Sequence, residues 1–230
     1  MSKVRWLEAH WPCGIRAISE ALKKNAFDDE SDDGFLITRI RNNRLEGCHI
    51  EKISTQETIL NPFGMEISQS RLVYKKIEFV LQDTFPQIEI HNHQRGLNLF
   101  LERMLESLDF DLVIKPIEVD PIQWITALSS IFDGIVEIRA IQASGIDLLP
   151  GITGELVAKS ESDITPHLEK LTNPKWTLVK KVNAVLHSSP SITSAVFSRN
   201  STINFKELLE SELIPCARKA LAIIHPPTMA

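Results

Sequence analysis

Glycine, cysteine and tyrosine are scarce in this chain, at nine, three and one of 230 residues. Neither a G-x-S-x-G elbow nor a Walker phosphate-binding loop occurs, so no motif indicates a serine hydrolase or a P-loop enzyme. No apolar run approaches the roughly 20 residues that a membrane helix needs. We therefore expect no membrane partner, and the motifs identify neither a reaction nor a cofactor.

The cysteines argue against a disulfide framework. Cys13, Cys48 and Cys216 are far apart, odd in number and form no C-x-x-C pair, a pattern typical of reduced cytosolic thiols. Residues 1–18 contain an acidic residue and no continuous apolar core, so we expect no secretory signal. Both features favour a cytoplasmic protein.

Charge is unevenly distributed along the chain. The formal net charge is −5, yet Arg39 to Lys76 contains seven Lys/Arg and four Glu, leaving −8 for the remainder. Five acidic residues lie between Asp28 and Asp33. The basic stretch has two interpretations that the sequence leaves open. It is either a sheet face that meets phosphate or a set of solvated hairpin residues.

Apolar periodicity predicts the elements of the first half. Residues 1–30 are expected to be a helical N-terminal segment, broken near Pro12 and Gly14. Its apolar residues at helical spacing are Val4, Leu7, Trp11, Ile15, Ile18 and Leu22. Residues 31–108 predict an antiparallel β-meander, with turns at 42–43 and 62–64. A covering helix is expected from about residue 95 to 108.

The second half, residues 109–230, alternates in type. Its order β-α-β-β-α-β predicts a ferredoxin-like unit, followed by an extra strand at 191–198. Asp120 and Pro121 predict the start of its first helix. Asn204 predicts the N-cap of a C-terminal helix from about Phe205. The fold class is therefore α+β, in two coupled parts.

Two histidines in the stretch EIHNH form a candidate metal site. Glu89, His91 and His93 lie on one side of a predicted strand, and two imidazoles with a carboxylate suit a transition metal. This arrangement would belong to a metal-dependent hydrolase or nuclease. The alternative is that the three residues are the polar solvent face of an edge strand.

Basic residues of the meander form a candidate nucleic-acid surface. Arg39 and Arg41 share a strand face and Arg44 follows the turn, so the three can reach backbone phosphates. Lys75 and Lys76 extend this set. Aromatic side chains are sparse nearby, which disfavours base stacking.

The string LDFDLVIKP, residues 108–116, resembles the strand that opens the second half of phage Rex-type superinfection-exclusion proteins. Bacterial Kiwa-type phage-defence proteins have a similar two-part plan, matched loosely here by element order over about residues 35–205. The resemblance implies a non-enzymatic component of a bacterial anti-phage defence system. It further implies DNA binding with little sequence specificity, often as a dimer.

Three functions remain open on these grounds. The first is a defence component that binds duplex DNA or RNA through phosphates, and the second is the metal-dependent hydrolase or nuclease. The third is a protein-interaction subunit with a protein partner or self-association.

Overall fold

The computed structural model describes most of the chain, in the ranges 2–60, 62–92, 96–149, 152–168, 178–206 and 210–225. These residues form four α-helices and 11 strands, a sheet-rich arrangement. The predicted α+β class is confirmed. None of the described helices has the length and apolar character needed to span a membrane.

The chain divides into two compact units, and each is assembled from separate stretches of sequence. Unit 2 contains Ala9–Asp83 and Ile90–Val113. Unit 1 contains Met1–Glu8, Thr84–Glu89 and Ile114–Ala230.

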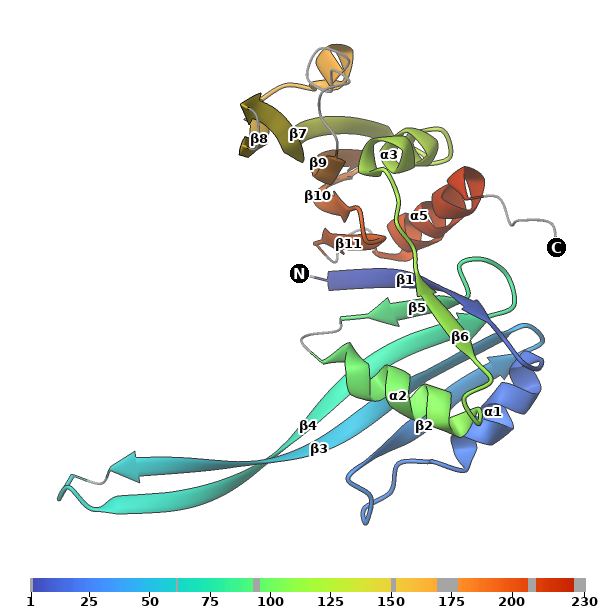
Figure 1. Ribbon diagram of the computed structural model, residues 1–230, viewed down its shortest axis with the longest axis vertical. Helices are drawn as coiled ribbons and strands as arrows, with labels where there is room; N and C mark the ends of the chain where they lie inside the picture. Colours follow the sequence, from blue (N-terminus) through green and yellow to red (C-terminus); the bar gives the residue numbers. More distant parts are fainter. Residues whose placement is uncertain are drawn as a thin grey trace. The chain divides into compact units, whose positions relative to one another are not determined.

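Unit 2 is an antiparallel meander with two helices (Figure 1). Its elements are α1 (Ile15–Lys23), β2 (Asp33–Arg41), β3 (Arg44–Leu60), β4 (Glu66–Gln82) and α2 (Leu97–Ser107). β3 pairs with both β2 and β4. The predicted turn at 42–43 joins β2 to β3, and the second turn contains Gly64 with φ of 78°, a conformation that glycine adopts without strain.

Aromatic side chains form the core of unit 2. The ring of Phe100, from α2, lies 6.3 Å from that of Phe35 and 5.3 Å from that of Phe79. Apolar residues at helical spacing are also buried on α1, namely Ile15, Ile18 and Leu22. We call the side of β2–β4 that carries Phe35 and Phe79 the helix face of unit 2, and the opposite side its outer face.

The β3–β4 hairpin extends far beyond β2. The pairing of β2 with β3 ends at Asp33 and Glu51, whereas β3 and β4 remain paired to Leu60 and Glu66. Residues 53–60 and 66–73 therefore form a two-stranded segment, the distal ribbon, which is visible in Figure 1. A two-stranded ribbon has only local support, since it lacks a third strand.

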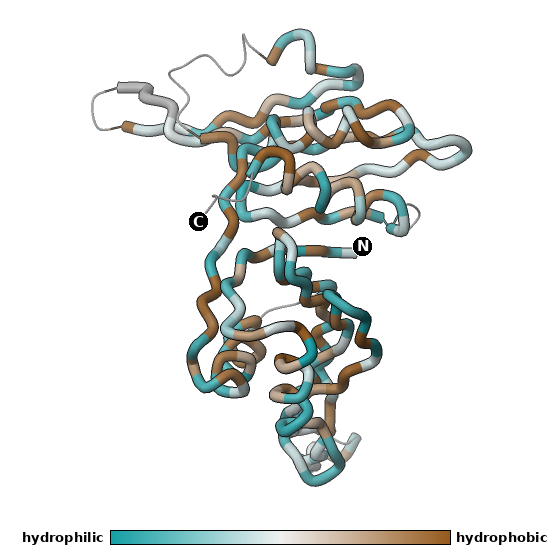
Figure 2. The backbone as a smooth tube through the Cα atoms, turned by 90° about the vertical axis from the view of Figure 1, so that its right-hand side faces the viewer, coloured by the Kyte–Doolittle hydropathy of each residue, from teal (hydrophilic) through white to brown (hydrophobic). Residues whose placement is uncertain are grey.

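Unit 1 is an antiparallel sheet with helices on one face (Figure 1). Its strands run in the order β1-β11-β10-β9-β7-β8. The elements that lie in it wholly or in part are β1 (Ser2–His10), β5 (Ile88–His91), β6 (Val113–Pro116), α3 (Pro121–Ser129), β7 (Ile135–Leu149), β8 (Ile152–Lys159), a 3-10 turn (Thr165–His167), β9 (Leu178–Ser188), β10 (Ser191–Ser198), β11 (Thr202–Phe205) and α5 (Glu210–Ile224). Hydrophobic and hydrophilic residues are interspersed along these elements (Figure 2), as half-buried elements require.

Trp124 is central to the core of unit 1. Its ring lies 5.7 Å from that of Trp6 and 5.2 Å from that of Phe197, and its indole nitrogen donates to the carbonyl of Ala217 on α5 at 2.9 Å. The Asp120 carboxylate accepts a hydrogen bond from the amide of Ile122 at 2.8 Å, which confirms the predicted N-cap of α3.

The prediction of a helical N-terminal segment over residues 1–30 is wrong for its first part. Residues Ser2–His10 are a strand, and the predicted helix is present only from Ile15. Val4 and Trp6 are both fully buried, which is the two-residue period of a strand. The helix was predicted because Leu7 lies three residues after Val4, which is also the spacing of neighbours on one helix face.

Two predictions for the second half also change. Asn204 lies inside β11 and is no helix cap, because β11 pairs with both β1 and β10; the described part of the last helix begins at Glu210. The ferredoxin-like unit is not confirmed. β7 lies between β8 and β9, and β6 lies off this path of strands.

Candidate functional site

Three arginines of the predicted basic surface gather at the β2–β3 hairpin. Arg41 and Arg44 are directly opposite each other, and Arg39 is opposite Glu46. A β-bulge just before Arg39 shifts the alternation of side chains by one residue. Arg39 and Arg41 therefore lie on the outer face, although they are an even number of residues from buried Phe35. We call Arg39, Arg41 and Arg44 the arginine cluster.

Positive charge in the arginine cluster is only partly compensated. The Nε of Arg44 donates to the Glu46 carboxylate at 2.9 Å. Within the described part of the chain, neither Arg39 nor Arg41 takes part in an ion pair. Like charges directly opposite on paired strands are destabilising. An anion that contacts the cluster would remove this repulsion.

Lys75 and Lys76 do not join the arginine cluster. Lys75 lies on the helix face, where its Nζ is 3.0 Å from Glu51, its cross-strand neighbour. Lys76 lies on the outer face, where it is opposite Ile50 of β3. Ile50 is six residues from Arg44, a distance of about 20 Å along the strand. The hydrogen bond to Glu78 at 2.6 Å raises the pKa of Lys76. Both lysines are therefore neutralised by carboxylates at a distance from the arginines.

Glu89 of the candidate metal site is buried rather than solvent-facing. Glu89 is only 3% exposed. The carboxylate accepts a hydrogen bond from the indole nitrogen of Trp6 at 2.8 Å and forms an ion pair with Nε of Arg218 at 2.9 Å. A carboxylate that already balances an arginine is poorly suited to bind a cation as well.

The other predicted metal ligands add no support. Ile88 and Ile90 on either side of Glu89 are also buried, so this strand is not the solvated edge that the alternative interpretation predicted. His93 lies outside the described residues. In the ranges that the structure describes, no group of three or more His, Cys, Asp and Glu side chains is arranged to hold a metal ion.

A buried histidine in unit 2 was not singled out from the sequence. His49 is 1% exposed and lies between the rings of Phe35 and Phe100 at 5.1 and 6.0 Å. Burial lowers its pKa, although nearby Asp33 opposes this effect. Because neutral imidazole is favoured, its 4.0 Å approach to Asp33 is not an ion pair at neutral pH. Asp33 is bound instead by Arg103, at 3.0 Å.

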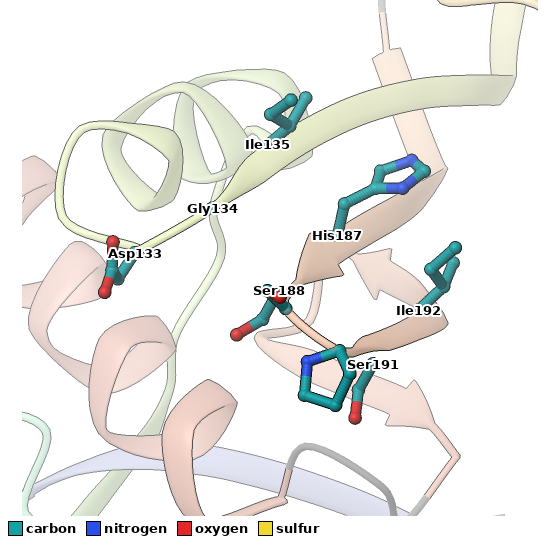
Figure 3. Close-up of a pocket in the computed structure, with 9 residues that line it drawn as sticks. Asp133, Gly134, Ile135, His187, Ser188, Ser191 and Ile192 are labelled. Carbon is teal, nitrogen blue, oxygen red and sulfur yellow. The ribbon is translucent and has the colours of Figure 1, made fainter.

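An open pocket of about 550 Å³ lies at the β9–β10 turn of unit 1 (Figure 3). His187 and Ser188 are neighbours on β9 and point to opposite sides. The imidazole of His187 is 3.3 Å from Glu137, and the hydroxyl of Ser188 donates to Glu212 at 3.0 Å. A serine nucleophile needs a histidine base within hydrogen-bond reach, so these two residues do not form a hydrolase site.

No protein-family model matches this chain, and no curated protein matches it either.

Proposed function

We propose that this protein is a non-enzymatic component of a bacterial anti-phage defence system that binds nucleic acid through its phosphate backbone. The observation that carries the binding function is the arginine cluster, with Arg41 directly opposite Arg44 and one glutamate among the three cations. The defence setting follows from the resemblance of residues 108–116 to Rex-type proteins.

The chemistry of arginine supports phosphate as the ligand. A guanidinium is planar and always charged, and it donates two parallel hydrogen bonds to phosphate oxygens. Arg39 and Arg41 are exposed on the outer face, so both are accessible in unit 2. Aromatic side chains suited to base stacking are absent from the arginine cluster itself. Recognition through the backbone would therefore be insensitive to base sequence.

The test is fluorescence anisotropy of a labelled duplex of about 30 base pairs, measured over a series of salt concentrations. Arg39→Glu/Arg41→Glu is expected to weaken binding. It should also reduce the slope of log K against log[salt] by about 1.8, for two lost phosphate contacts. The matched control is Arg16→Glu/Lys24→Glu, which makes the same charge change at exposed residues of unit 2. Equal binding by the two double variants would contradict the assignment.

A protein-interaction function is the second candidate, and the distal ribbon favours it. The tip of the hairpin exposes large apolar side chains: Leu60 at the end of β3 and Phe63 and Met65 in the loop are 67%, 87% and 61% exposed. Exposed apolar groups of this size mark interaction sites. Sedimentation of the wild type and Phe63→Ser over a range of concentrations tests self-association; identical profiles that stay monomeric would contradict self-association through this loop.

A further inference from the structure

One face of the unit 1 sheet is covered by α3 and α5, and no helix in the described part of unit 1 covers the other. α3 and α5 lie on the same side of the strands (Figure 1), where Val182, Ala184 and Phe197 are fully buried. Residues that alternate with these point to the opposite side. No described helix of unit 1 lies on that side, which we call the open face.

Strand register places basic residues across the whole width of the open face. Arg5 on β1 is in the same cross-strand row as Lys181 on β9, through Thr202 and Ser198. The neighbouring row begins at Lys3 on β1 and ends at Lys159 on β8. Across these six strands, the row spans about 24 Å at about 4.8 Å per strand. The open-face cations are Lys3, Arg5, Lys159 and Lys181.

Two acidic residues of the open face are already neutralised by other cations. Glu137 is paired with Arg139, and Glu155 with Lys180. Within the described ranges, Lys159 and Lys181 form no ion pair, and both are exposed. These two lysines are therefore uncompensated cations on the open face.

Polar atoms near β1 and β9 also lack partners. The Nε of Arg5 and the Oδ1 of Asn183 are buried without a hydrogen bond to any described residue. Burial lowers the pKa of Arg5, and burial together with the charge of Arg5 lowers the pKa of Lys3. Such unsatisfied groups call for an explanation, and for the donor Nε of Arg5 the oxygen of an anionic ligand supplies one.

We propose that the open face of unit 1 binds the phosphate backbone of a single-stranded nucleic acid that runs across the strands. The proposal rests on the proposed function for the class of ligand, but it uses a different unit and different residues. A single strand can follow a flat face for the full 24 Å estimated from strand spacing, whereas a cylindrical duplex touches a flat surface along a narrow line. Polar Thr202, Asn204 and Gln142 lie among the cations on this face, which suits hydrogen bonding to phosphate and sugar.

Binding is expected to discriminate little between bases. The open-face positions identified from the register include aliphatic Val196 and Val157, and none is Phe, Tyr or Trp. The imidazole of His187 lies on this face and is 3.3 Å from Glu137. Base stacking on Phe, Tyr or Trp, which gives single-strand binders much of their affinity, is therefore missing. Charge alone would give binding that weakens steeply as salt is added.

The experiment measures anisotropy of labelled oligo-dT and oligo-dA, each about 20 nucleotides long, over a range of salt concentrations. Lys159→Glu/Lys181→Glu is expected to lower affinity for both oligonucleotides at least tenfold and to reduce the salt slope by about 1.4, for two phosphate contacts. The matched control is Lys24→Glu/Lys219→Glu, with the same charge change at exposed residues. The milder Lys159→Gln/Lys181→Gln should give an intermediate loss, and thermal unfolding confirms that each variant folds.

The outcomes separate this proposal from the function proposed above. If Lys159→Glu/Lys181→Glu binds single strands as the control does, the open face is not a binding surface, whatever Arg39→Glu/Arg41→Glu does to duplex binding. If Lys159→Glu/Lys181→Glu loses binding and Arg39→Glu/Arg41→Glu does not, the open face is the ligand site and the arginine cluster is not. A loss confined to one oligonucleotide would overturn backbone recognition.

Discussion

The indole nitrogen of Trp6 donates a hydrogen bond of 2.8 Å to the carboxylate of Glu89, 83 residues away in sequence. The same carboxylate lies 2.9 Å from Nε of Arg218 on the last helix. A strand near the N-terminus, a central strand and the last helix are thus connected through one buried carboxylate. This arrangement explains Glu89 as a structural residue of unit 1.

Replacing Glu89 with Ala should destabilise the protein by about 3–5 kcal/mol, because the Arg218 side chain, which is only 18% exposed, would lose its ion pair with the buried Glu89 carboxylate. Trp6→Phe keeps an aromatic ring but removes the donor, and should cost about 1–3 kcal/mol. Urea denaturation measures both changes. A loss below about 1 kcal/mol for Glu89→Ala would show that this network contributes little to stability.

His49 should make stability depend on pH. Burial lowers its pKa below the ordinary value of 6.5, so the unfolded chain binds a proton more readily than the folded one. The free energy of unfolding is then highest above pH 6.5 and falls as the pH drops toward the folded-state pKa, by at most about 1.4 kcal/mol per pH unit.

The variant His49→Phe tests this pH dependence. Phenylalanine retains a ring between Phe35 and Phe100 but cannot titrate, so its free energy of unfolding should fall less than that of the wild type between pH 7.5 and pH 5.5, a range that spans the ordinary histidine pKa of about 6.5. His10→Gln serves as the control at an exposed histidine. Parallel pH curves for wild type and His49→Phe would contradict the role of His49.

Backbone amides of the distal ribbon should exchange with solvent faster than those of the three-stranded part of β3. Residues 53–60 and 66–73 pair only with each other, whereas residues 44–51 of β3 have a partner strand on both sides. Local opening of a two-stranded segment disrupts fewer contacts. Hydrogen exchange detected by mass spectrometry measures this difference, and equal protection along β3 would mean that the ribbon has a further partner in solution.

Sequence signals succeeded where the physical cause is local. Asp120 followed by proline predicts the start of α3, because a side-chain cap and a preset φ act within one turn. The turn at 42–43 and the apolar stripe of α2, with Phe100 and Met104 buried, have the same local origin. Such features need no knowledge of distant residues.

Strand assignments failed where pairing is distant. Ser2 is opposite Phe205 across β1 and β11, and no local pattern contains that partner. Asn204 therefore resembles a helix cap in sequence, although its backbone belongs to a strand between two others. Tertiary pairing overrides local preference in such segments because the ladder hydrogen bonds are made with residues far along the chain.

For the candidate site, the sequence by itself determined which residues carry charge and that Arg39 and Arg41 share a side of their strand. Only the tertiary structure decided which side that is, through a bulge before Arg39, and placed Lys75 and Lys76 on opposite faces beside their own carboxylates. It also decided that the cations of β1, β8 and β9 lie on one sheet face. The physical reason is that charge belongs to a residue, whereas a charged surface belongs to the register and faces of strands that pair over long distances.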